Sequence, residues 1–270
     1  MKSGIKVEPW SYMLRHFSDN NVDIKIEYTG IYGSDLHANK DERSGTMYPV
    51  IAGHAIAGKV IAKGFKVTHP EEGNLVGFGA QAYGCLENSC HACSRDLDPP
   101  PHCPKSVFTY NSKYSDGEQA HGAYAEATRV DAKYAFKIPA SIKPAHAAPL
   151  MCAGATVFST MLCKGVSKND CVGIIGIGGL GHFTIQYAHV LGAEAVAILH
   201  SPNKRNECLK FGVSIFVNTA NKKKVEAVSG TLNYLFVTSN SHTSQYGKLN
   251  SWMDFGSQIV LLGLPVGQLS

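Results

Sequence analysis

The stretch CVGIIGIGGLG, Cys171 to Gly181, decides the fold of this chain. Its first half is a short, nearly continuous apolar run, as expected for a strand that is covered on both faces. Its second half places Gly176, Gly178 and Gly181 in the pattern G-x-G-x-x-G. In a dinucleotide-binding unit the first glycine permits a tight turn, the second lets the pyrophosphate approach the backbone, and the third lets helix and strand pack closely. The stretch therefore predicts a strand that runs into a phosphate-binding turn.

The segments that follow alternate between helix and strand patterns. Residues His182–Leu191 carry apolar side chains at helical spacing and end before Gly192, which predicts the helix whose N-terminus receives the phosphates. Apolar runs predict the second to fifth strands at Glu194–Leu199, Val213–Val217, Leu232–Val237 and Gln258–Leu264. This alternation implies a doubly wound parallel sheet. Three glycines in this pattern more often form a turn with only a structural role. The strand before them and the helix and second strand after them favour cofactor binding here.

The composition is ordinary for a globular protein. With 270 residues, the chain is long enough for one large or two ordinary domains. The formal net charge is +4, and the tight basic run Lys222–Lys224 is better explained as a solvated face than as a nucleic-acid groove. We find no signal-peptide pattern and no apolar run that approaches a membrane span. We therefore expect a cytoplasmic protein with no nucleic-acid or membrane partner, whose eight cysteines are thiols or metal ligands.

The N-terminal half has a different pattern. VDIKIEY, Val22–Tyr28, alternates apolar and polar residues, which predicts a half-exposed strand. TGIYGSDLH, Thr29–His37, is rich in small and polar residues and predicts a turn, and residues Tyr48–Ala62 predict a second strand region. Short strands with glycine punctuation continue to about residue 140. They indicate a β-rich, barrel-like domain that precedes the parallel sheet.

Several segments together carry a resemblance to a known family: TGIYGSDLH, PVIAGHAIAGKV, the cysteines after Gly84, GAYAEATRV, APLMCAGATVFS and IGIGGLGHFTIQYA. In this order they resemble the zinc-dependent medium-chain alcohol dehydrogenases, and most of all the cinnamyl-alcohol-dehydrogenase branch, which reduces aldehydes with NADPH. The resemblance covers about residues 22–267. It implies an α/β protein with a GroES-like β-barrel domain at residues 1–155. A Rossmann-type doubly wound parallel sheet that lacks its last strand follows at residues 156–270.

The resemblance implies a catalytic zinc site that this chain has altered. The family holds this zinc through two cysteines and one histidine, with an open position for water or substrate. The histidine matches His54 and the second cysteine matches Cys152, but Tyr32 stands in place of the first cysteine and Ala55 in place of a glutamate. A neutral phenol is a poor zinc ligand. We therefore expect His54 and Cys152 to line the active site, and we expect zinc to bind there less tightly than in the family.

Other catalytic positions of the family persist. Ser34 matches the hydroxyl that begins proton relay from the substrate oxygen, and His37 matches a relay or ribose-contacting position. Asp35 matches the carboxylate that orients the zinc-binding histidine. Without the motif, capping of a turn would be the preferred explanation for Ser34 and Asp35.

A second zinc site is implied by the cysteine cluster. The family's structural zinc uses the spacing C-x2-C-x2-C-x7-C, whereas Cys90, Cys93, Asp96 and Cys103 give C-x2-C-x2-D-x6-C. The expected ligand set therefore contains a carboxylate in place of the third cysteine, and a loop of free thiols is the alternative. Cys85 lies outside this pattern and is expected to be a buried thiol.

The cofactor is expected to be NADP. An NAD site places Asp or Glu at the end of the second strand to hold the ribose hydroxyls, and this chain has no carboxylate there. A hydroxyl and cations that can bind a 2′-phosphate stand there instead, at His200, Ser201, Lys204 and Arg205. A solvated cationic loop is the alternative explanation.

The resemblance extends the cofactor site to the rest of the nucleotide domain. It places Thr156 against the nicotinamide ring, on a helix that also contains Cys152. It places Val237 and Leu262–Leu264 against the carboxamide, and Gly179 and Leu180 complete the phosphate-binding turn.

The expected function is that of an NADP-dependent alcohol dehydrogenase or aldehyde reductase acting on a small-molecule alcohol or aldehyde. A zinc-independent reductase, in which Tyr32 serves the substrate oxygen, is one alternative. A catalytically impaired or truncated relative that only binds NADP(H) is another. The family's dimer commonly forms through the strand that is missing here, so we expect a monomer or an altered interface.

Overall fold

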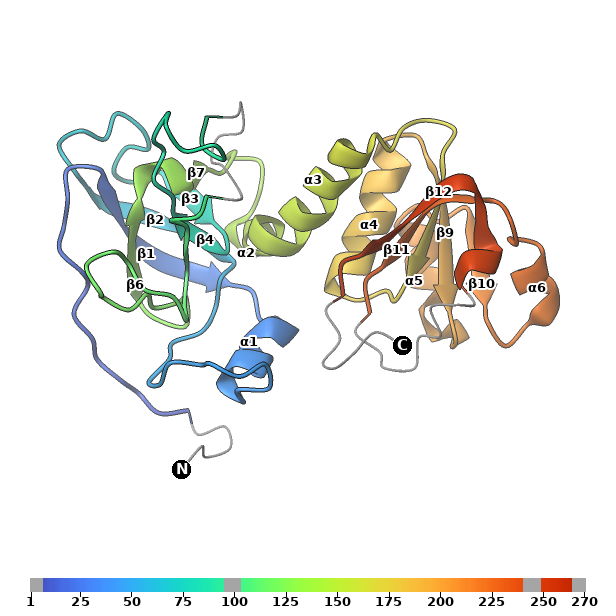
Figure 1. Cartoon of the computed structure of the whole chain (residues 1–270), viewed down its shortest axis with the longest axis horizontal. Coiled ribbons are helices and arrows are strands. Elements are labelled where there is room, and N and C mark those ends of the chain that lie inside the picture. The colour runs from blue at the N-terminus through green and yellow to red at the C-terminus, as the bar shows by residue number, and fades with distance from the viewer. Residues whose placement is uncertain (1–6, 95–102, 240–248, 264–270) are drawn as a thin grey trace. The chain divides into compact units, whose positions relative to one another are not determined.

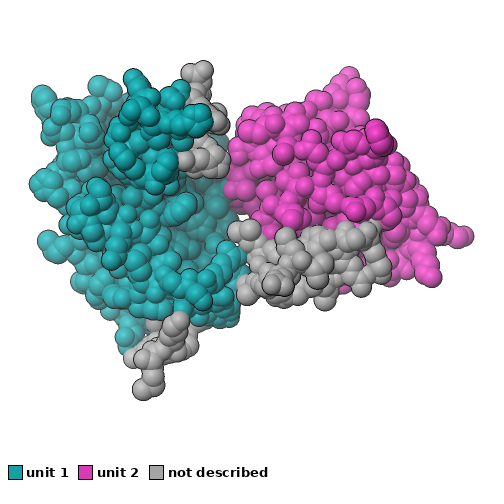
Figure 2. Space-filling view, viewed as in Figure 1, with its two compact units in different colours: residues 1–152 teal, residues 153–270 magenta. Residues whose placement is uncertain are grey.

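The computed structural model describes residues 7–94, 103–239 and 249–263. The chain forms two compact units, residues 1–152 (unit 1) and residues 153–270 (unit 2), which Figure 2 colours separately. The units divide after Cys152, whereas the domains expected from the sequence divide after residue 155.

Unit 1 is built on antiparallel strands (Figure 1). A five-stranded sheet has the order β6-β1-β2-β3-β7, and a small sheet pairs β4 with β5. Alternate residues of β1, among them Val22 and Ile24, are fully buried against Ile56 and Phe78. The strands are β1 Asn21–Thr29, β2 Ile56–Lys63, β3 Leu75–Phe78, β4 Gln81–Tyr83, β5 Val107–Phe108, β6 Ala127–Asp131 and β7 Phe136–Lys137.

The loops of unit 1 depart from the sequence expectation at two places. The second strand begins only at Ile56, because the preceding residues form a loop in which Gly53 has φ +96° and Ala55 is buried. The prediction of a turn at Thr29–His37 was wrong for its second half, where Gly33–Asn39 form helix α1. Seven residues are too few to show helical periodicity. The helix is set by Asp35, whose carboxylate accepts the backbone N–H of Tyr32 at 2.9 Å.

Unit 2 contains the predicted parallel sheet, with strand order β10-β9-β8-β11-β12. The strands are β8 Cys171–Ile175, β9 Glu194–Leu199, β10 Ile215–Asn218, β11 Leu232–Val237 and β12 Met253–Leu261. β9 and β11 have the predicted bounds, whereas β10 starts later and β12 starts earlier than predicted. Leu264, the predicted end of the last strand, lies outside the described residues.

Both faces of this sheet are covered. On one face Ile174 and Phe236 pack with Ile185 and Ala188 of helix α4, Gly179–Val190. On the other face, side chains of β9 and β11 pack with Leu249. Burial on two faces explains why these strands are continuous apolar runs in the sequence. The remaining helical elements of unit 2 are α5 Arg205–Lys210, α6 Lys222–Glu226, η3 Pro202–Lys204 and η4 Asn250–Trp252.

One helical run belongs to both units. It comprises α2 Pro144–Pro149, a π-helical turn η2 Leu150–Gly154, and α3 Ala155–Lys164. By length and composition it could cross a membrane, so the expectation that no apolar run approaches a span was wrong. Core helices of globular proteins pass the same test. Here Ala147 and Ala148 are buried in a core cluster of unit 1, and Val157 and Met161 in one of unit 2.

Candidate functional site

The phosphate-binding turn has the geometry that its three glycines predict. Gly176 has φ +84°, a backbone conformation that favours glycine. A side chain at Gly178 would meet no atom within 4 Å, so the backbone there is open to an approaching ligand. A Cβ at Gly181 would lie 2.0 Å from the carbonyl oxygen of Gly176, so the third glycine permits the close packing of α4 on the turn. Helix α4 begins at Gly179 and directs its first N–H groups toward this opening.

The end of β9 carries cations beside this turn. The Nζ atom of Lys204 donates a hydrogen bond to the carbonyl oxygen of Ile177, inside the turn, at 2.6 Å. Ser201 caps the short helix η3 by accepting the backbone N–H of Asn203. His200 and Arg205 are exposed nearby in the sequence. An ammonium group fixed on the phosphate-binding turn favours a ligand with several phosphates.

The remaining predicted cofactor residues lie at strand ends and on a helix. Thr156 is half-buried in α3, and Val237 is the buried last residue of β11. Leu262 follows β12 and its backbone N–H donates to the carbonyl of Val237 at 2.9 Å. In a parallel sheet these carboxyl ends are where ligands bind. Leu264 lies outside the described residues.

Unit 1 brings together the predicted metal ligand His54 and Asp35, the carboxylate predicted to orient it. The Nδ1 atom of His54 is 2.9 Å from Asp35 Oδ1, and both residues are buried. The other oxygen, Oδ2, accepts the hydroxyl of Tyr124 and the backbone N–H of Tyr32, each at 2.9 Å. Four donors, including the backbone N–H of Gly53 at 3.1 Å to Oδ1, thus satisfy one buried carboxylate. Asp35 therefore both caps α1 and fixes the orientation of the His54 ring.

The second ring nitrogen of His54 faces Cys152. Its Nε2 atom and the Sγ of Cys152 share a hydrogen bond of 3.2 Å. Burial lowers the pKa of His54, but the hydrogen bonds to Asp35 and Cys152 outweigh it and raise that pKa to about 9. Burial raises the pKa of Asp35, and its hydrogen bond to His54 more than reverses this, so the carboxyl pKa is lowered. Without a metal, the pair is therefore an imidazolium and a carboxylate near neutral pH.

Tyr32 does not supply a third ligand atom to this pair. Its hydroxyl donates to the backbone carbonyl of Pro149 at 3.1 Å, and its ring lies beside the ring of His54, with centroids 4.8 Å apart. The ring also fills the space above Gly30, where a Cβ would come within 2.6 Å of it. The phenol is thus a packed, hydrogen-bonded group.

The proton-relay candidates lie on α1. Ser34 is the second residue of this helix, and His37 is half-buried with its Nδ1 against the carboxylate of Glu42. The hydrogen bond to His37 lowers the pKa of Glu42. Sequence reasoning missed two aromatic neighbours of the site, Tyr110 and Tyr124. Burial, followed by the charge of Asp35, raises the pKa of both phenols, so both are neutral donors. The segment GAYAEATRV contains Tyr124, but nothing in that segment points to Asp35.

The cysteine lobe differs from the expectation in its membership. The ligand atoms of Cys85, Cys90, Cys93 and Cys103 all lie within 4.8 Å of one another. The prediction that Cys85 stands apart as a buried thiol was wrong, because the chain after β4 turns back and brings its sulfur to 3.5 Å from those of Cys93 and Cys103. Asp96 lies outside the described residues.

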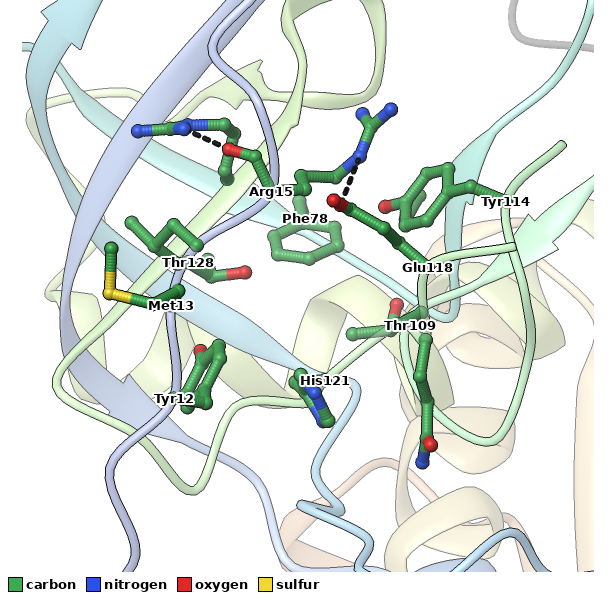
Figure 3. Close-up of a pocket in the computed structure, with 14 residues that line it drawn as sticks. Tyr12, Met13, Arg15, Phe78, Thr109, Tyr114, Glu118, His121 and Thr128 are labelled. Atoms are coloured by element: carbon green, nitrogen blue, oxygen red, sulfur yellow. Dashed lines mark hydrogen bonds and ion pairs between the residues drawn. The ribbon is translucent and has the colours of Figure 1, made fainter. Parts of the chain in front are cut away.

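A separate cavity of about 260 Å³ lies in unit 1 between the N-terminal segment and the sheet (Figure 3). Its lining includes Tyr12, Arg15, Tyr114, Glu118 and His121. The predicted catalytic and metal residues do not line it. The guanidinium of Arg15 stacks 3.9 Å from the centroid of the Tyr114 ring. The cavity is therefore distinct from the site around His54.

A parallel sheet with a glycine-rich turn, in one chain with an antiparallel unit that holds a His–Cys pair and a four-cysteine lobe, is the architecture of two-domain dehydrogenases. Residues 18–140 match the family model "Alcohol dehydrogenase GroES-like domain", and residues 179–270 match "Zinc-binding dehydrogenase". The chain is 36% identical over 262 residues to a probable cinnamyl alcohol dehydrogenase of Oryza sativa, covering 96% of this chain and 72% of the relative. It is 35% identical to a probable mannitol dehydrogenase of Stylosanthes humilis, over 96% of this chain and 72% of that protein.

Solved structures give the same result. A cinnamyl alcohol dehydrogenase from Sorghum bicolor aligns with a TM-score of 0.92 and 31% identity, covering 100% of this chain and 76% of that one. An enzyme of this type from Helicobacter pylori, complexed with NADP(H), aligns with a TM-score of 0.83 and 30% identity, covering 92% of this chain and 69% of that one. The chain belongs to the zinc-type medium-chain alcohol dehydrogenase family, in its cinnamyl-alcohol-dehydrogenase-like branch.

The two family zinc sites fit this chain to different degrees. Four sulfurs within 4.8 Å of one another match the donor set of a structural zinc. Among the described residues they are also the one group of three or more His, Cys, Asp or Glu ligand atoms gathered in this way. The catalytic position offers the Nε2 of His54 and the Sγ of Cys152, with a neutral phenol as its third neighbour. A catalytic zinc needs three protein ligands, so these residues do not form that site.

Proposed function

We propose that the chain is an NADP(H)-dependent alcohol dehydrogenase or aldehyde reductase that moves a hydride between nicotinamide C4 and a carbonyl carbon. The observation that carries the proposal is the anchoring of Lys204 on the phosphate-binding turn, at the end of a strand that has no ribose-binding carboxylate. Membership in an alcohol-dehydrogenase family supplies the reaction class.

The preference for NADP rests on charge at the end of β9. A 2′-phosphate carries negative charge, which Asp or Glu would repel and which Lys204 and Arg205 attract. The Ser201 hydroxyl adds a hydrogen-bond donor on the same turn. NADP(H) complexed to the Helicobacter pylori relative is consistent with this choice.

The proposed chemistry in unit 1 uses protein groups and no catalytic metal. During reduction, the hydride bonds to the carbonyl carbon while the carbonyl oxygen takes a proton. Tyr32 is the proposed proton donor, because its neutral hydroxyl already donates to an uncharged carbonyl oxygen and can exchange that acceptor for a substrate oxygen. Ser34 lies two residues after Tyr32, at the start of α1, and is the proposed source of the replacement proton. His54 and Asp35 supply fixed charge beside Tyr32.

The cofactor proposal is tested by calorimetric titration with NADPH and NADH. The variant Ser201→Asp keeps a residue that caps η3 but places a carboxylate beside the 2′-phosphate. We expect NADPH affinity to fall at least about tenfold, with NADH affinity kept or improved. Ser229→Asp makes the same charge change in unit 2 on a different turn and should leave both affinities unchanged. Equal effects of the two variants on NADPH would contradict the proposal.

The reaction is tested by following NADPH oxidation across a panel of aldehydes. Activity that survives chelation and is lost in Tyr32→Phe supports the proposed proton donor, since Phe keeps the ring and removes the hydroxyl. Activity unchanged in Tyr32→Phe excludes that role. A second candidate, a relative that binds NADP(H) without turnover, is favoured by the incomplete ligand set around His54. NADPH binding without oxidation of any substrate would establish it.

A further inference from the structure

We propose that the cavity of unit 1 between Arg15 and His121 is a binding site for a small aromatic amide. The residues that line it all belong to unit 1, and none of them is a predicted catalytic, metal or cofactor residue. The inference therefore stands apart from the proposed enzymatic activity.

Two buried polar atoms in the wall of this cavity have no hydrogen-bond partner in the described part of the chain. They are Nε of Arg15 and Nδ1 of His121. The rest of the Arg15 guanidinium is engaged, since its Nη2 donates to Asp116 at 3.4 Å and the group stacks on the Tyr114 ring. A buried polar atom without a partner costs folding free energy, and a ligand that supplies the partner recovers it. These two atoms are therefore the expected contacts of a polar ligand.

The carboxylate beside Arg15 indicates which polar group the ligand carries. Oε2 of Glu118 lies 4.0 Å from Nε of Arg15, which is too far for a hydrogen bond. An amide presents a carbonyl oxygen and an N–H whose heavy atoms are about 2.3 Å apart, so it can accept from Arg15 and donate to Glu118 at once. One hydroxyl oxygen would have to bind both atoms at an angle of about 90°, which is narrower than its preferred tetrahedral angle. The pair therefore favours an amide over an alcohol.

The charges of the site favour a neutral ligand. Arg15 already faces two carboxylates, Asp116 at 3.4 Å and Glu118 at 4.0 Å. The second lining cation, Arg129, binds Asp23 through Nε at 2.6 Å and through Nη2 at 2.7 Å. Each lining cation thus already has a carboxylate partner. A carboxylate ligand would be repelled by Asp116 and Glu118.

The space between Arg15 and His121 fits an aromatic ring. The buried side chains of Phe78, Ala82 and Ala120 give the cavity an apolar wall. In Figure 3 the Phe78 ring lies between Arg15 on one side and His121 on the other. The cavity volume of about 260 Å³ exceeds the roughly 150 Å³ that can hold benzene. A ring with an amide at one end and a polar group at the other would therefore span the cavity.

His121 indicates the polar group at the second end. Burial lowers the pKa of His121, so its ring is neutral near pH 7, with one nitrogen that donates and one that accepts. A phenol hydroxyl can both donate and accept, so it can pair with Nδ1 in either tautomer. The probe is therefore 4-hydroxybenzamide, which combines this hydroxyl with the amide. It has no aldehyde and no alcohol carbon, so it is not a substrate of the proposed reaction.

The first test is calorimetric titration of the full-length wild-type protein with 4-hydroxybenzamide, with and without excess NADPH. We expect a dissociation constant of about 1 mM or below in both conditions. Benzamide, which lacks the hydroxyl, should bind at least about threefold more weakly, and 4-hydroxybenzoate at least about tenfold more weakly.

Three results of this titration would overturn the proposal. The first is no binding of 4-hydroxybenzamide. The second is binding that NADPH abolishes, because the amide would then occupy the cofactor's carboxamide site in unit 2. The third is 4-hydroxybenzoate that binds as tightly as the amide.

The second test uses His121→Phe, which keeps an aromatic ring and removes Nδ1. This variant should bind 4-hydroxybenzamide at least about threefold more weakly than the wild type and should bind benzamide equally well. The control is His146→Phe, since His146 is an exposed histidine of α2 that does not line the cavity, and it should leave both affinities unchanged. Equal losses for the two probes, or equal effects of the two variants, would overturn the contact with His121. If His121→Phe folds poorly, the wild-type titrations still decide the proposal.

Discussion

A single side chain, Tyr32, separates unit 1 from a three-ligand zinc site. His54 and Cys152 already lie 3.2 Å apart, and Asp35 already orients the histidine. We expect Tyr32→Cys to bind about one more zinc per chain than the wild type, because it restores the second thiolate of a Cys2His set. Metal analysis before and after chelation measures this.

The control for this prediction is Tyr32→Ser. Serine removes the phenol ring and has nearly the shape of cysteine, but it supplies no soft donor. It should gain no zinc. Equal zinc gain in both variants would show that the ring only blocks the site and that a third ligand comes from elsewhere.

His121 gives a pH dependence that is independent of the metal questions. The centroid of its ring lies 4.6 Å from that of the Tyr12 ring, and the side chain lines the cavity of unit 1 (Figure 3). Burial disfavours the charged ring and lowers its pKa. An unfolded histidine has a pKa of about 6.5, so as pH falls below that value the unfolded state takes up a proton before the folded state does. The free energy of unfolding is therefore full above that pH and falls as pH drops toward the lowered pKa of the folded state.

Urea unfolding at several pH values measures the effect. The free energy of unfolding of the wild type should fall more steeply between about pH 7.5 and pH 5 than that of His121→Gln, whose side chain does not titrate. Parallel curves for the two proteins would show that His121 keeps its ordinary pKa.

Some site residues could be singled out where a family segment contains them. The structure brings Asp35, His54 and Cys152 into contact, and each stands in such a segment, while the relay role of Ser34 stays a prediction. The contact of Tyr124 with Asp35 was not predictable, since it joins positions 89 residues apart through the fold. The position of Cys85 also required the structure, because linear spacing cannot show that the chain reverses at Leu86.

At the scale of elements, the glycine-rich turn and α4 together form the proposed pyrophosphate site. Its glycines have different roles, since one leaves room for the ligand and another lets α4 pack on the turn. A Cβ at Gly178 meets nothing within 4 Å, whereas one at Gly181 meets the Gly176 carbonyl at 2.0 Å. We expect Gly178→Ala to keep its stability within about 0.5 kcal/mol and to lose at least about tenfold in NADPH affinity, because the methyl group occupies the pyrophosphate approach.

Gly181→Ala should lose stability in addition to binding. Its methyl group forces α4 away from the turn, which should cost about 1–3 kcal/mol of unfolding free energy as well as binding. Gly179→Ala is the control for stability alone, since its Cβ meets nothing within 4 Å and alanine favours the helix. Calorimetry and thermal unfolding measure both quantities. Tight NADPH binding by Gly178→Ala would show that the pyrophosphate does not approach there.

Strands that are buried on both faces were predictable from the sequence, because burial requires them to be nearly continuous apolar runs. β9 and β11 are covered on both faces and appear as apolar runs with clear ends. β12 begins at Met253 within a mixed sequence, and its first half could not be recognised. Helix α1 depends on one carboxylate contact instead of an apolar stripe.

At the scale of the whole molecule, each unit has hydrophobic clusters of its own. Those of unit 1 contain residues such as Val22 and Ala147, and those of unit 2 residues such as Val157 and Leu235. We expect calorimetry to show two unfolding transitions. NADPH at 100 times its dissociation constant should stabilise the unit 2 transition by about 2.7 kcal/mol, and a strong chelator should lower the unit 1 transition.

The Gly181→Ala variant assigns the two transitions, because it should lower the unit 2 transition and leave the unit 1 transition in place. One transition that moves as a whole with both ligands would contradict independent units.

The division of the chain at a single point, after Cys152, has a consequence for biosynthesis. Each unit is one uninterrupted segment, so all the thiols of the lobe leave the ribosome before any residue of the phosphate-binding turn. Domains generally fold in this order during synthesis. The lobe can therefore bind its metal on the nascent chain, whereas NADPH can bind only after the strands of unit 2 have been synthesised. Binding of the metal and binding of the cofactor would then belong to different stages of translation.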